Sequence, residues 1–250
     1  FKFGSDLLLL MKEGLVPLSA ALQSDRLNPR VFLTDKIYYE INREIAAYAD
    51  NFGWQIIYFA DQTMLLINIP SSTGIQQYVM NTITDSWAQF VDMTTTCFTL
   101  FNDQLYFGGD GYVGKFWDGT SDNGNNIAAN AQQAYSYFDS PGQNKRFTLI
   151  RPIIQSDNGV PTVLCNISTD FNTQPPIGQL SFNPGLTGIG TWDSGKWDLN
   201  NWGGGYLTTK NWQGVQGIGF SASVNMNVLS QGIDFHWVST DYVFQKGGVL

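Results

Sequence analysis

This chain of 250 residues has few charged side chains and little of the chemistry that catalytic sites use most often. Asp, Glu, Lys and Arg make up 14% of the residues, against roughly 25% in ordinary soluble domains. The shortage indicates either large surfaces covered by other protein, as in a subunit of an assembly, or a surface of neutral polar side chains. His236 is the only histidine, so a Ser-His-Asp triad would have to use it, and the G-x-S-x-G motif is missing. We therefore predict a structural His236, no catalytic residues, no metal site and no cofactor.

Cysteine and long apolar runs are equally scarce. Cys97 and Cys165 lie in strand-like segments, and we expect two buried thiols, with a disulfide as the alternative. The longest apolar stretch, at residues 65–70, has the length of a strand and not the roughly 18 residues of a membrane helix. We predict no membrane span. Because Phe1 is not an initiator methionine and reads as the middle of a strand, we expect a fragment or a processed product.

The charge balance is acidic, with 21 Asp and Glu against 13 Lys and Arg and a net charge of −8. A protein that grips nucleic acid by its phosphates needs the opposite balance. The acidic charge therefore excludes a general basic footprint. It does not exclude DNA as a neighbour, because a surface past which DNA slides should not hold it.

The first half of the chain reads as antiparallel meanders with one helix. A hairpin is predicted at residues 6–18, and a helix at 35–49 with Thr34 as N-cap and a stripe of Ile37, Ile41, Ile45 and Tyr48. Short strands joined by tight turns follow, at 54–59, 64–69, 75–80, 86–91, 97–101, 105–107 and 112–117. Four-stranded meanders of this period are the blades of a β-propeller. We predict an incomplete propeller over residues 1–122, with one blade at 54–91 and most of another at 97–117.

The second half, residues 123–250, is predicted to be a β-sandwich-like domain. A weakly patterned junction at 121–133 precedes it, and strands are expected at 134–138, 147–155, 162–169, 218–224, 233–238 and 242–244. A long region rich in Gly, Pro and Trp, from 174 to 213, interrupts them. A loop of this length indicates a function.

Tryptophan recurs every five residues in this long region, at Trp192, Trp197 and Trp202. Steps of five place helical side chains about 140° apart and strand side chains on opposite faces, so one regular element cannot bury all three on one side. We predict that these residues, with Trp212, contact another domain or subunit. Because Asp193 and Asp198 follow two of them, a sugar platform is the alternative.

Three further motifs have both a functional and a structural interpretation. Lys145, Arg146 and Arg151 form the only basic cluster; it is either a solvated strand end or a contact with a neighbouring subunit or a DNA phosphate. Gly109, Gly111 and Gly114 fit the dinucleotide fingerprint literally, but a strand follows them instead of a helix, so we predict a hairpin turn. The loop at 118–124 places its glycine at the wrong position for an EF-hand, so we predict a turn-rich linker.

Several segments resemble, in order, tail hub or nozzle proteins of short-tailed bacteriophages and prophages. They are residues 52–55, 64–70, 77–87, 105–113, the tryptophan run at 192–202 and the ending at 241–250. The resemblance implies a non-enzymatic virion structural protein in the tail, which joins the head-side adaptor below the portal to distal tail parts and forms the DNA exit channel. It also implies a ring homo-oligomer of six copies, through which double-stranded DNA passes without specific binding. The alternative function is a receptor-binding or carbohydrate-binding tail module that could cleave glycans.

Overall fold

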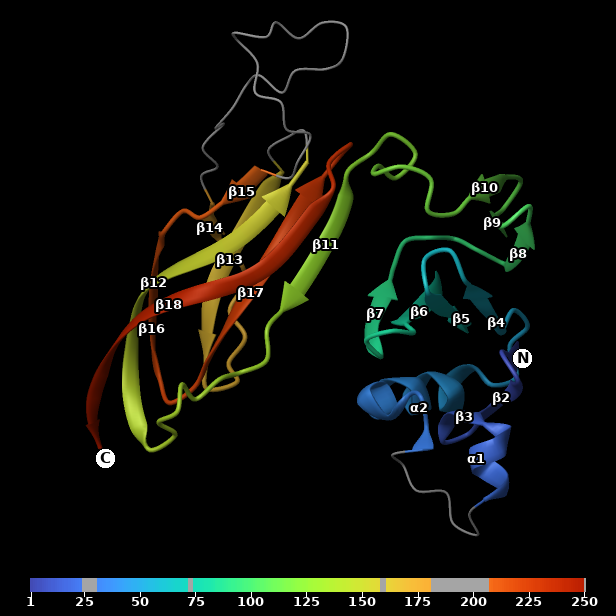
Figure 1. Ribbon diagram of the computed structural model, residues 1–250, viewed down its shortest axis with the longest axis horizontal. Helices are drawn as coiled ribbons and strands as arrows, with labels where there is room; N and C mark the ends of the chain where they lie inside the picture. The colour runs from blue at the N-terminus through green and yellow to red at the C-terminus, as the bar shows by residue number, and fades with distance from the viewer. Residues whose placement is uncertain (24–30, 72–73, 158–160, 181–206, 250) are drawn as a thin grey trace, which may run out of the picture. The chain divides into compact units, whose positions relative to one another are not determined.

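Strands dominate the computed structural model, which describes residues 1–250 except 24–30, 72–73, 158–160, 181–206 and 250. Within these residues all the sheets are antiparallel, so the prediction of an all-β chain with antiparallel sheets is confirmed. The chain divides into two compact units, Phe1–Asp118 and Gly119–Leu250, drawn in Figure 1. This division lies close to the boundary predicted between residues 122 and 123.

The first unit contains three antiparallel sheets that follow one another along the chain. They are β1 (Lys2–Phe3), β2 (Asp6–Met11) and β3 (Gly14–Pro17); then β4 (Gln55–Phe59), β5 (Met64–Ser71), β6 (Gly74–Asn81) and β7 (Ser86–Phe90); then β8 (Cys97–Phe101), β9 (Gln104–Gly108) and β10 (Val113–Lys115). Strands adjacent in sequence pair with each other in every sheet. Each sheet is therefore a meander, and the predicted hairpin at 6–18 is confirmed.

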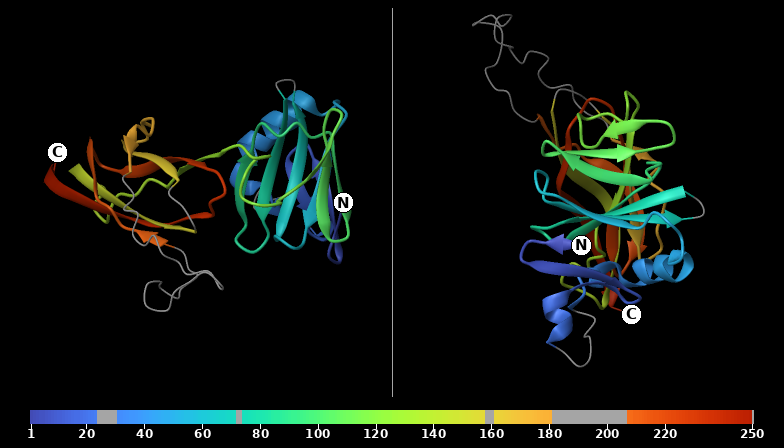
Figure 2. Two further views of the ribbon diagram at one scale, coloured as in Figure 1. Left: turned by 90° about the horizontal axis from the view of Figure 1, so that it is seen from above. Right: turned by 90° about the vertical axis from the view of Figure 1, so that its right-hand side faces the viewer.

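The middle sheet, β4 to β7, is buried on both faces. On β5, Leu65, Ile67 and Ile69 belong to a core shared with β2, β3 and α2 (Tyr38–Tyr48), whereas Leu66 belongs to a second core shared with Phe98, Leu105 and Phe116. Because successive strand residues point to opposite faces, a strand between two apolar layers needs an unbroken apolar run. The sequence of β5 supplies one over residues 64–67, before Asn68, and the strand arrangement can be followed in Figure 2.

The predicted helix at 35–49 begins later than expected. A 3₁₀ turn, Asp35–Ile37, precedes α2, and Thr34 does not cap it, because its buried hydroxyl accepts a hydrogen bond from the Leu15 amide at 3.1 Å. This hydrogen bond links the residue before the 3₁₀ turn to β3. Ile41 and Ile45 are buried as the stripe predicted. A second short helix, α1 (Leu18–Leu22), was not predicted.

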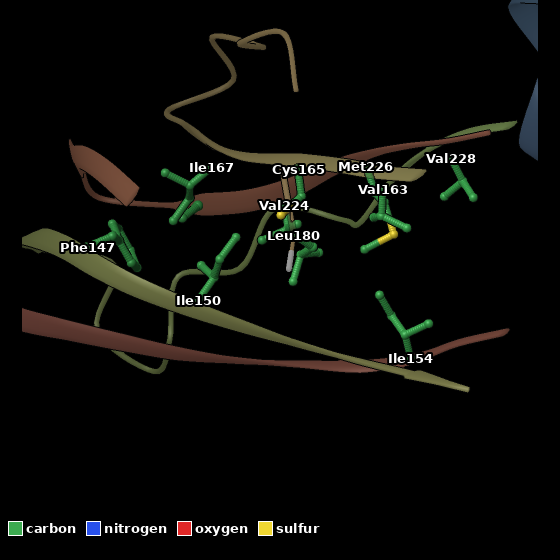
Figure 3. Close-up of a cluster of buried hydrophobic side chains, with 11 residues drawn as sticks. Phe147, Ile150, Ile154, Val163, Cys165, Ile167, Leu180, Val224, Met226 and Val228 are labelled. Carbon is green, nitrogen blue, oxygen red and sulfur yellow. The ribbon is translucent and has the colours of Figure 1, made fainter. Parts of the chain in front are cut away.

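The second unit contains two antiparallel sheets in which all paired strands but β13 and β14 are separated in sequence by other strands. One sheet has the order β11 (Ile127–Gln132), β17 (Ala222–Ser230), β13 (Thr162–Thr169), β14 (Gly178–Gln179). In the other, β12 (Gln143–Ser156) pairs with β18 (Phe235–Val249) along one side and with β16 (Gln213–Gly219) and β15 (Leu207–Thr209) along the other. Figure 3 shows their shared core, which contains Phe147, Ile150 and Ile154 of β12 and residues of β13 and β17. Two sheets facing across one core are the arrangement of a sandwich.

Pro152 lies in the middle of β12, where a proline removes a ladder hydrogen bond. Pairing with β16 stops at Ile150 and pairing with β15 resumes at Ile154, so Pro152 faces an interruption between these two strands. Residues 210–212, which connect β15 to β16, lie at this interruption. The missing amide donor is therefore tolerated, and Trp212 is placed beside the centre of β12.

Several predicted elements of the second unit were wrong. The strand expected at 218–224 spans a turn between β16 and β17, because Asp170 accepts hydrogen bonds from the amides of Phe220 and Ser221 at 2.8 and 2.9 Å. A side chain at Gly219 would meet the same carboxylate, since a Cβ would lie 2.6 Å from Asp170 Oδ2.

The strands expected at 233–238 and 242–244 form one strand, β18. The predicted junction contains β11, and residues 134–138 contain only a bridge between Ser136 and Ala222.

Candidate functional site

The predicted tryptophan contacts can be followed at one position. Trp192, Trp197 and Trp202, with the neighbouring Asp193 and Asp198, lie outside the described residues. Trp212 is described and is 45% exposed. The guanidinium carbon of Arg151 lies 4.6 Å from the centroid of the Trp212 ring, which is a cation–π contact. The structure thus brings together Trp212 and Arg151, which the sequence assigned to two different candidate groups.

Asp241 of β18 fixes the orientation of this guanidinium. Its Oδ2 accepts from Arg151 Nε at 2.9 Å and from an Arg151 terminal nitrogen at 2.6 Å, and the two residues are directly opposite in the β12–β18 ladder. Both side chains are about one-third to two-fifths exposed. A pair of this exposure contributes on the order of 0–1 kcal/mol to stability. Its main effect is positional, because it holds the guanidinium against the indole ring.

Lys145 does not belong to an exposed basic cluster, contrary to the prediction. Its side chain is 1% exposed, and Nζ donates to the carbonyl oxygens of Ser140, Gln143 and Phe220 at 2.6, 2.9 and 2.8 Å. Lys145 lies two residues before the core residue Phe147 and so points to the same inward face, whereas Arg146 is exposed on the opposite face. The buried ammonium ties two turns together and is unavailable to a partner or to DNA.

The sequence did not predict a row of amides in the first unit, of which Asn68 and Gln77 are buried and Gln55 is partly buried. Gln55, Asn68 and Gln77 are opposite one another on β4, β5 and β6. Gln55 exchanges two hydrogen bonds with the backbone of Phe98, at 2.6 and 2.8 Å, and so links the middle sheet to β8. Asn68 and Gln77 donate to the carbonyl oxygens of Thr95 and Met93 at 3.3 and 3.2 Å. The feature of the sequence that could have indicated this row is Asn68, an amide within the otherwise apolar part of β5.

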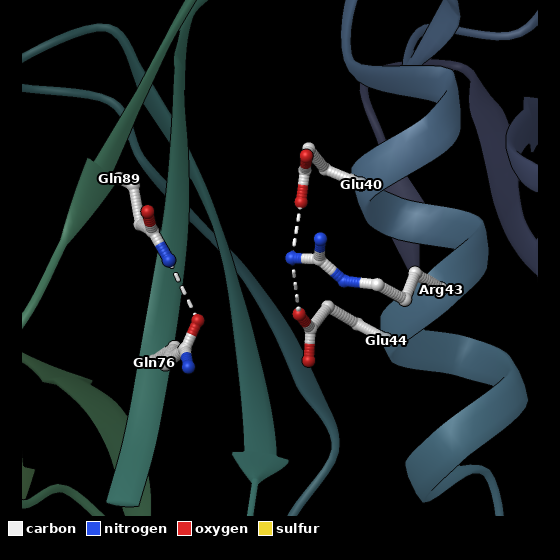
Figure 4. A network of polar contacts seen from close by, with 5 residues as sticks. All are labelled: Glu40, Arg43, Glu44, Gln76 and Gln89. Carbon is white, nitrogen blue, oxygen red and sulfur yellow. Dashed lines mark hydrogen bonds and ion pairs between the residues drawn. The ribbon is translucent and has the colours of Figure 1, made fainter. Parts of the chain in front are cut away.

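The polar surface beside α2 is a separate network, shown in Figure 4. Arg43 pairs with Glu40 and, at 3.2 Å, with the buried Glu44, while Gln89 donates to Gln76 at 2.6 Å across β6 and β7. Burial, with the nearby carboxylates, raises the pKa of Tyr78. The first set of contacts lies within α2 and the second within the sheet, so they form no shared site.

The remaining motifs occupy structural positions. Gly109 and Gly111 lie in the β9–β10 turn, where the Gly109 amide donates to the Tyr112 carbonyl, so the predicted hairpin turn is confirmed. His236 is exposed on β18, 3.3 Å from Asp234 Oδ2. Among the described residues no three His, Cys, Asp or Glu side chains are grouped as metal ligands.

The two cysteines are free thiols in different surroundings. Cys165 is buried as predicted, and burial raises its pKa to about 12; its thiol donates to Gln213 Oε1 at 2.8 Å. Cys97 is exposed on β8, so the expectation of a second buried thiol was wrong. Its side chain alternates with Phe98, which occupies the inward position of that strand.

Comparison with known proteins adds no assignment to this geometry. No family model matches the chain, and no curated protein matches it significantly. In the part of the chain that the structure describes, no helix is long and apolar enough to cross a membrane.

Proposed function

We propose that this chain is a non-enzymatic structural subunit of a bacteriophage tail, of the hub or nozzle type. In this role it joins the head-side adaptor to distal tail parts and surrounds the DNA exit channel in a ring of copies, six by the resemblance. The observation that carries the proposal is the middle sheet of the first unit: β2, β3 and α2 pack on one face of it, and residues of the following sheet pack on the other. Consecutive meanders packed face to face are what neighbouring propeller blades require.

Three of the segments that resemble tail proteins support this proposal because they coincide with the stacked sheets. Residues 64–70 lie within β5, residues 77–87 cover most of β6 and the start of β7, and residues 105–113 span β9 and the turn to β10. They therefore include the strands that form both cores. A sequence similar to that of tail proteins in these strands is expected if both pack the strands into the same kind of core.

The charge of the chain supports a channel through which DNA slides. The net charge is −8, and Lys145 is buried away from any phosphate. Counterion release, which drives general DNA binding, depends on exposed Lys and Arg. An acidic wall repels the DNA backbone and leaves it free to move.

The proposal is tested in virions of the phage or prophage whose genome encodes this sequence. Mass spectrometry of purified particles should find its peptides, and electron cryomicroscopy should place its density in a ring around the DNA exit channel. Particles that lack the protein would contradict the proposal.

The carbohydrate-binding alternative has a separate test. Trp212 is half-exposed, as a sugar platform requires, but Arg151 covers one face of its ring. Glycan-array binding by the purified chain that is lost in both Trp197→Ala and Trp212→Ala would support this alternative. Binding by neither the wild type nor the variants would remove it.

A further inference from the structure

An open groove of about 380 Å³ lies between β2 and β4 in the first unit. Residues 8–10 of β2 line one side, residues 54–56 at the start of β4 line the other, and Phe1 completes the lining. All of these side chains are apolar except that of Gln55, which is engaged with the backbone of Phe98. The side chains therefore offer an apolar surface, and polar recognition in the groove has to come from the backbone.

The backbone at the end of β2 is free on the side of the groove. β1 covers only the start of β2, where its last contact is a pair of hydrogen bonds between Phe1 and Leu8, at 2.7 and 2.9 Å. The N–H and C=O groups of alternate residues in an antiparallel strand point to the same side. Those of Leu10 therefore point, like those of Leu8, away from β3 and along the edge that β1 leaves uncovered.

The pairing of β2 with β3 agrees with this direction. Leu10 is opposite Leu15, whose amide donates to Thr34 Oγ1 at 3.1 Å and whose carbonyl accepts from the Leu33 amide at 2.9 Å. The polar groups of Leu15 are thus directed away from β2, so Leu10 and Leu15 exchange no hydrogen bonds. Within the part of the chain that the structure describes, no strand pairs with the other edge of β2 beyond Leu8.

We propose that the groove binds an extended strand of a separate polypeptide, which continues the line of β1 along the free edge of β2. An antiparallel strand satisfies both backbone groups of Leu10 with a single residue, and such pairing is slightly more stable than parallel pairing. This is peptide recognition by addition of a strand to a sheet edge. A purely apolar ligand would instead leave both groups of Leu10 unpaired. The free edge, residues 9–11, is about 10 Å long, so the bound strand is short and ends or turns away beside Phe1.

The side chains around the groove define the sequence that the bound strand needs. Residues directly opposite each other in an antiparallel pair have their side chains on the same face. Leu10 packs against the core cluster that includes Trp54 and Ile56, so the residue opposite Leu10 presents its side chain to these two and has to be apolar. Its neighbours, opposite Leu9 and Met11, point to the outer face of the sheet and can be polar. The expected occupant is therefore a strand with the pattern polar, apolar, polar.

The test uses the purified chain of 250 residues and a synthetic peptide, acetyl-Lys-Lys-Thr-Val-Thr-amide, whose valine is intended to lie opposite Leu10. NMR follows the hydrogen exchange of individual amides. In the free chain the Leu10 amide should exchange faster than that of Leu9, which faces β3. At a peptide concentration about ten times the dissociation constant, roughly a tenth of the chain remains free. Exchange at Leu10 should then slow about tenfold, whereas exchange at Leu9 should not change.

A control peptide and two protein variants separate backbone pairing from apolar contact. Replacing the valine of the peptide by N-methylvaline removes the donor to the Leu10 carbonyl and should weaken binding at least about tenfold. Ile56→Thr removes apolar surface from the groove and should weaken binding roughly fivefold. Ile37→Thr is the matched control and should bind like the wild type, because Ile37 packs against the same core but does not line the groove. Circular dichroism checks that both variants fold.

Equal binding of the two peptides would overturn the proposal, because the groove would then be an apolar site without backbone pairing. Unchanged exchange at Leu10 with peptide at about 10 mM would also contradict it, since a dissociation constant of about 1 mM already gives near-saturation there. If the Leu10 amide of the free chain becomes protected as the protein concentration rises, a second copy occupies the edge and the proposed partner is wrong. The inference does not depend on the proposed function, because every measurement uses the purified chain.

Discussion

The two units build their sheets in opposite ways. In the first unit every strand pairs with its neighbour in sequence, and one sheet is buried on both faces. In the second unit the long β12–β18 pair joins residues about 90 positions apart, and its outer face is exposed. When strands that are neighbours in sequence pair, further sheets can be stacked in the order of the chain. When distant strands pair, as in the second unit, two sheets enclose one core and an outer face stays exposed.

The largest expected effect is loss of core packing, and it should separate the two kinds of sheet. Leu66→Ala and Ile67→Ala should each destabilise the first unit by about 2–5 kcal/mol, because adjacent residues of β5 fill two different cores. In β12, Phe147→Ala should cost about 3–5 kcal/mol but Leu149→Ala less than about 1 kcal/mol. Urea unfolding measures these values. Similar losses for Phe147→Ala and Leu149→Ala in a monomer would contradict the one-sided burial of β12.

Lys145→Met should have the next largest effect, about 2–3 kcal/mol on the stability of the second unit. The substitution keeps much of the side-chain volume but removes the ammonium donor from three carbonyl oxygens, of which only that of Ser140 also accepts from a backbone amide, that of Gln143. Arg146→Met is the control, and it should lie within about 0.5 kcal/mol of the wild type in the monomer because its side chain is exposed. Thermal unfolding distinguishes the two variants, and equal midpoints would refute the role of the buried ammonium.

Gln55→Leu should destabilise the first unit by about 1–3 kcal/mol. The amide and carbonyl of Phe98 lose the two hydrogen bonds that link the middle sheet to β8. The control is Gln89→Leu, whose side chain pairs with Gln76 at the exposed surface and should matter little. Hydrogen exchange of the Phe98 amide should increase in Gln55→Leu only, and unchanged protection would argue against this link.

The smallest effect concerns the two thiols. At pH 8 an alkylating reagent should label Cys97 quickly and Cys165 only on unfolding, because Cys165 is buried and its pKa is raised to about 12. The folded state holds this proton more tightly than the unfolded state, so the stabilisation is complete below about pH 9 and falls as the pH rises towards 12. Mass spectrometry reports the labelling, and equal rates for the two cysteines would contradict the burial.

The sequence predicted the first unit better than the second for a physical reason. Hairpins leave local signals, such as the turn residues between β4 and β5 and the largely apolar sequence of β5. The pairing of β12 with β18 leaves none, so β18 was divided into two strands and the turn at Phe220 was read as strand. Burial of Lys145 was equally hidden, because its three acceptors are backbone carbonyls, and one of them, that of Phe220, is 75 residues away in the sequence. At the candidate site, the contact of Trp212 with Arg151 depends on the same non-local pairing.

The strand β11 has a mechanical consequence. All six of its side chains are exposed, so its attachment to β17 depends almost entirely on backbone hydrogen bonds. A force that pulls the chain from the first unit reaches β11 once the contacts of Thr120 and Gly124 with the turn at Gln231 and Gly232 have given way. In single-molecule stretching we therefore expect β11 to detach at a lower force than the core of the second unit. The released length of chain would act as an extension between the two units while both remain folded.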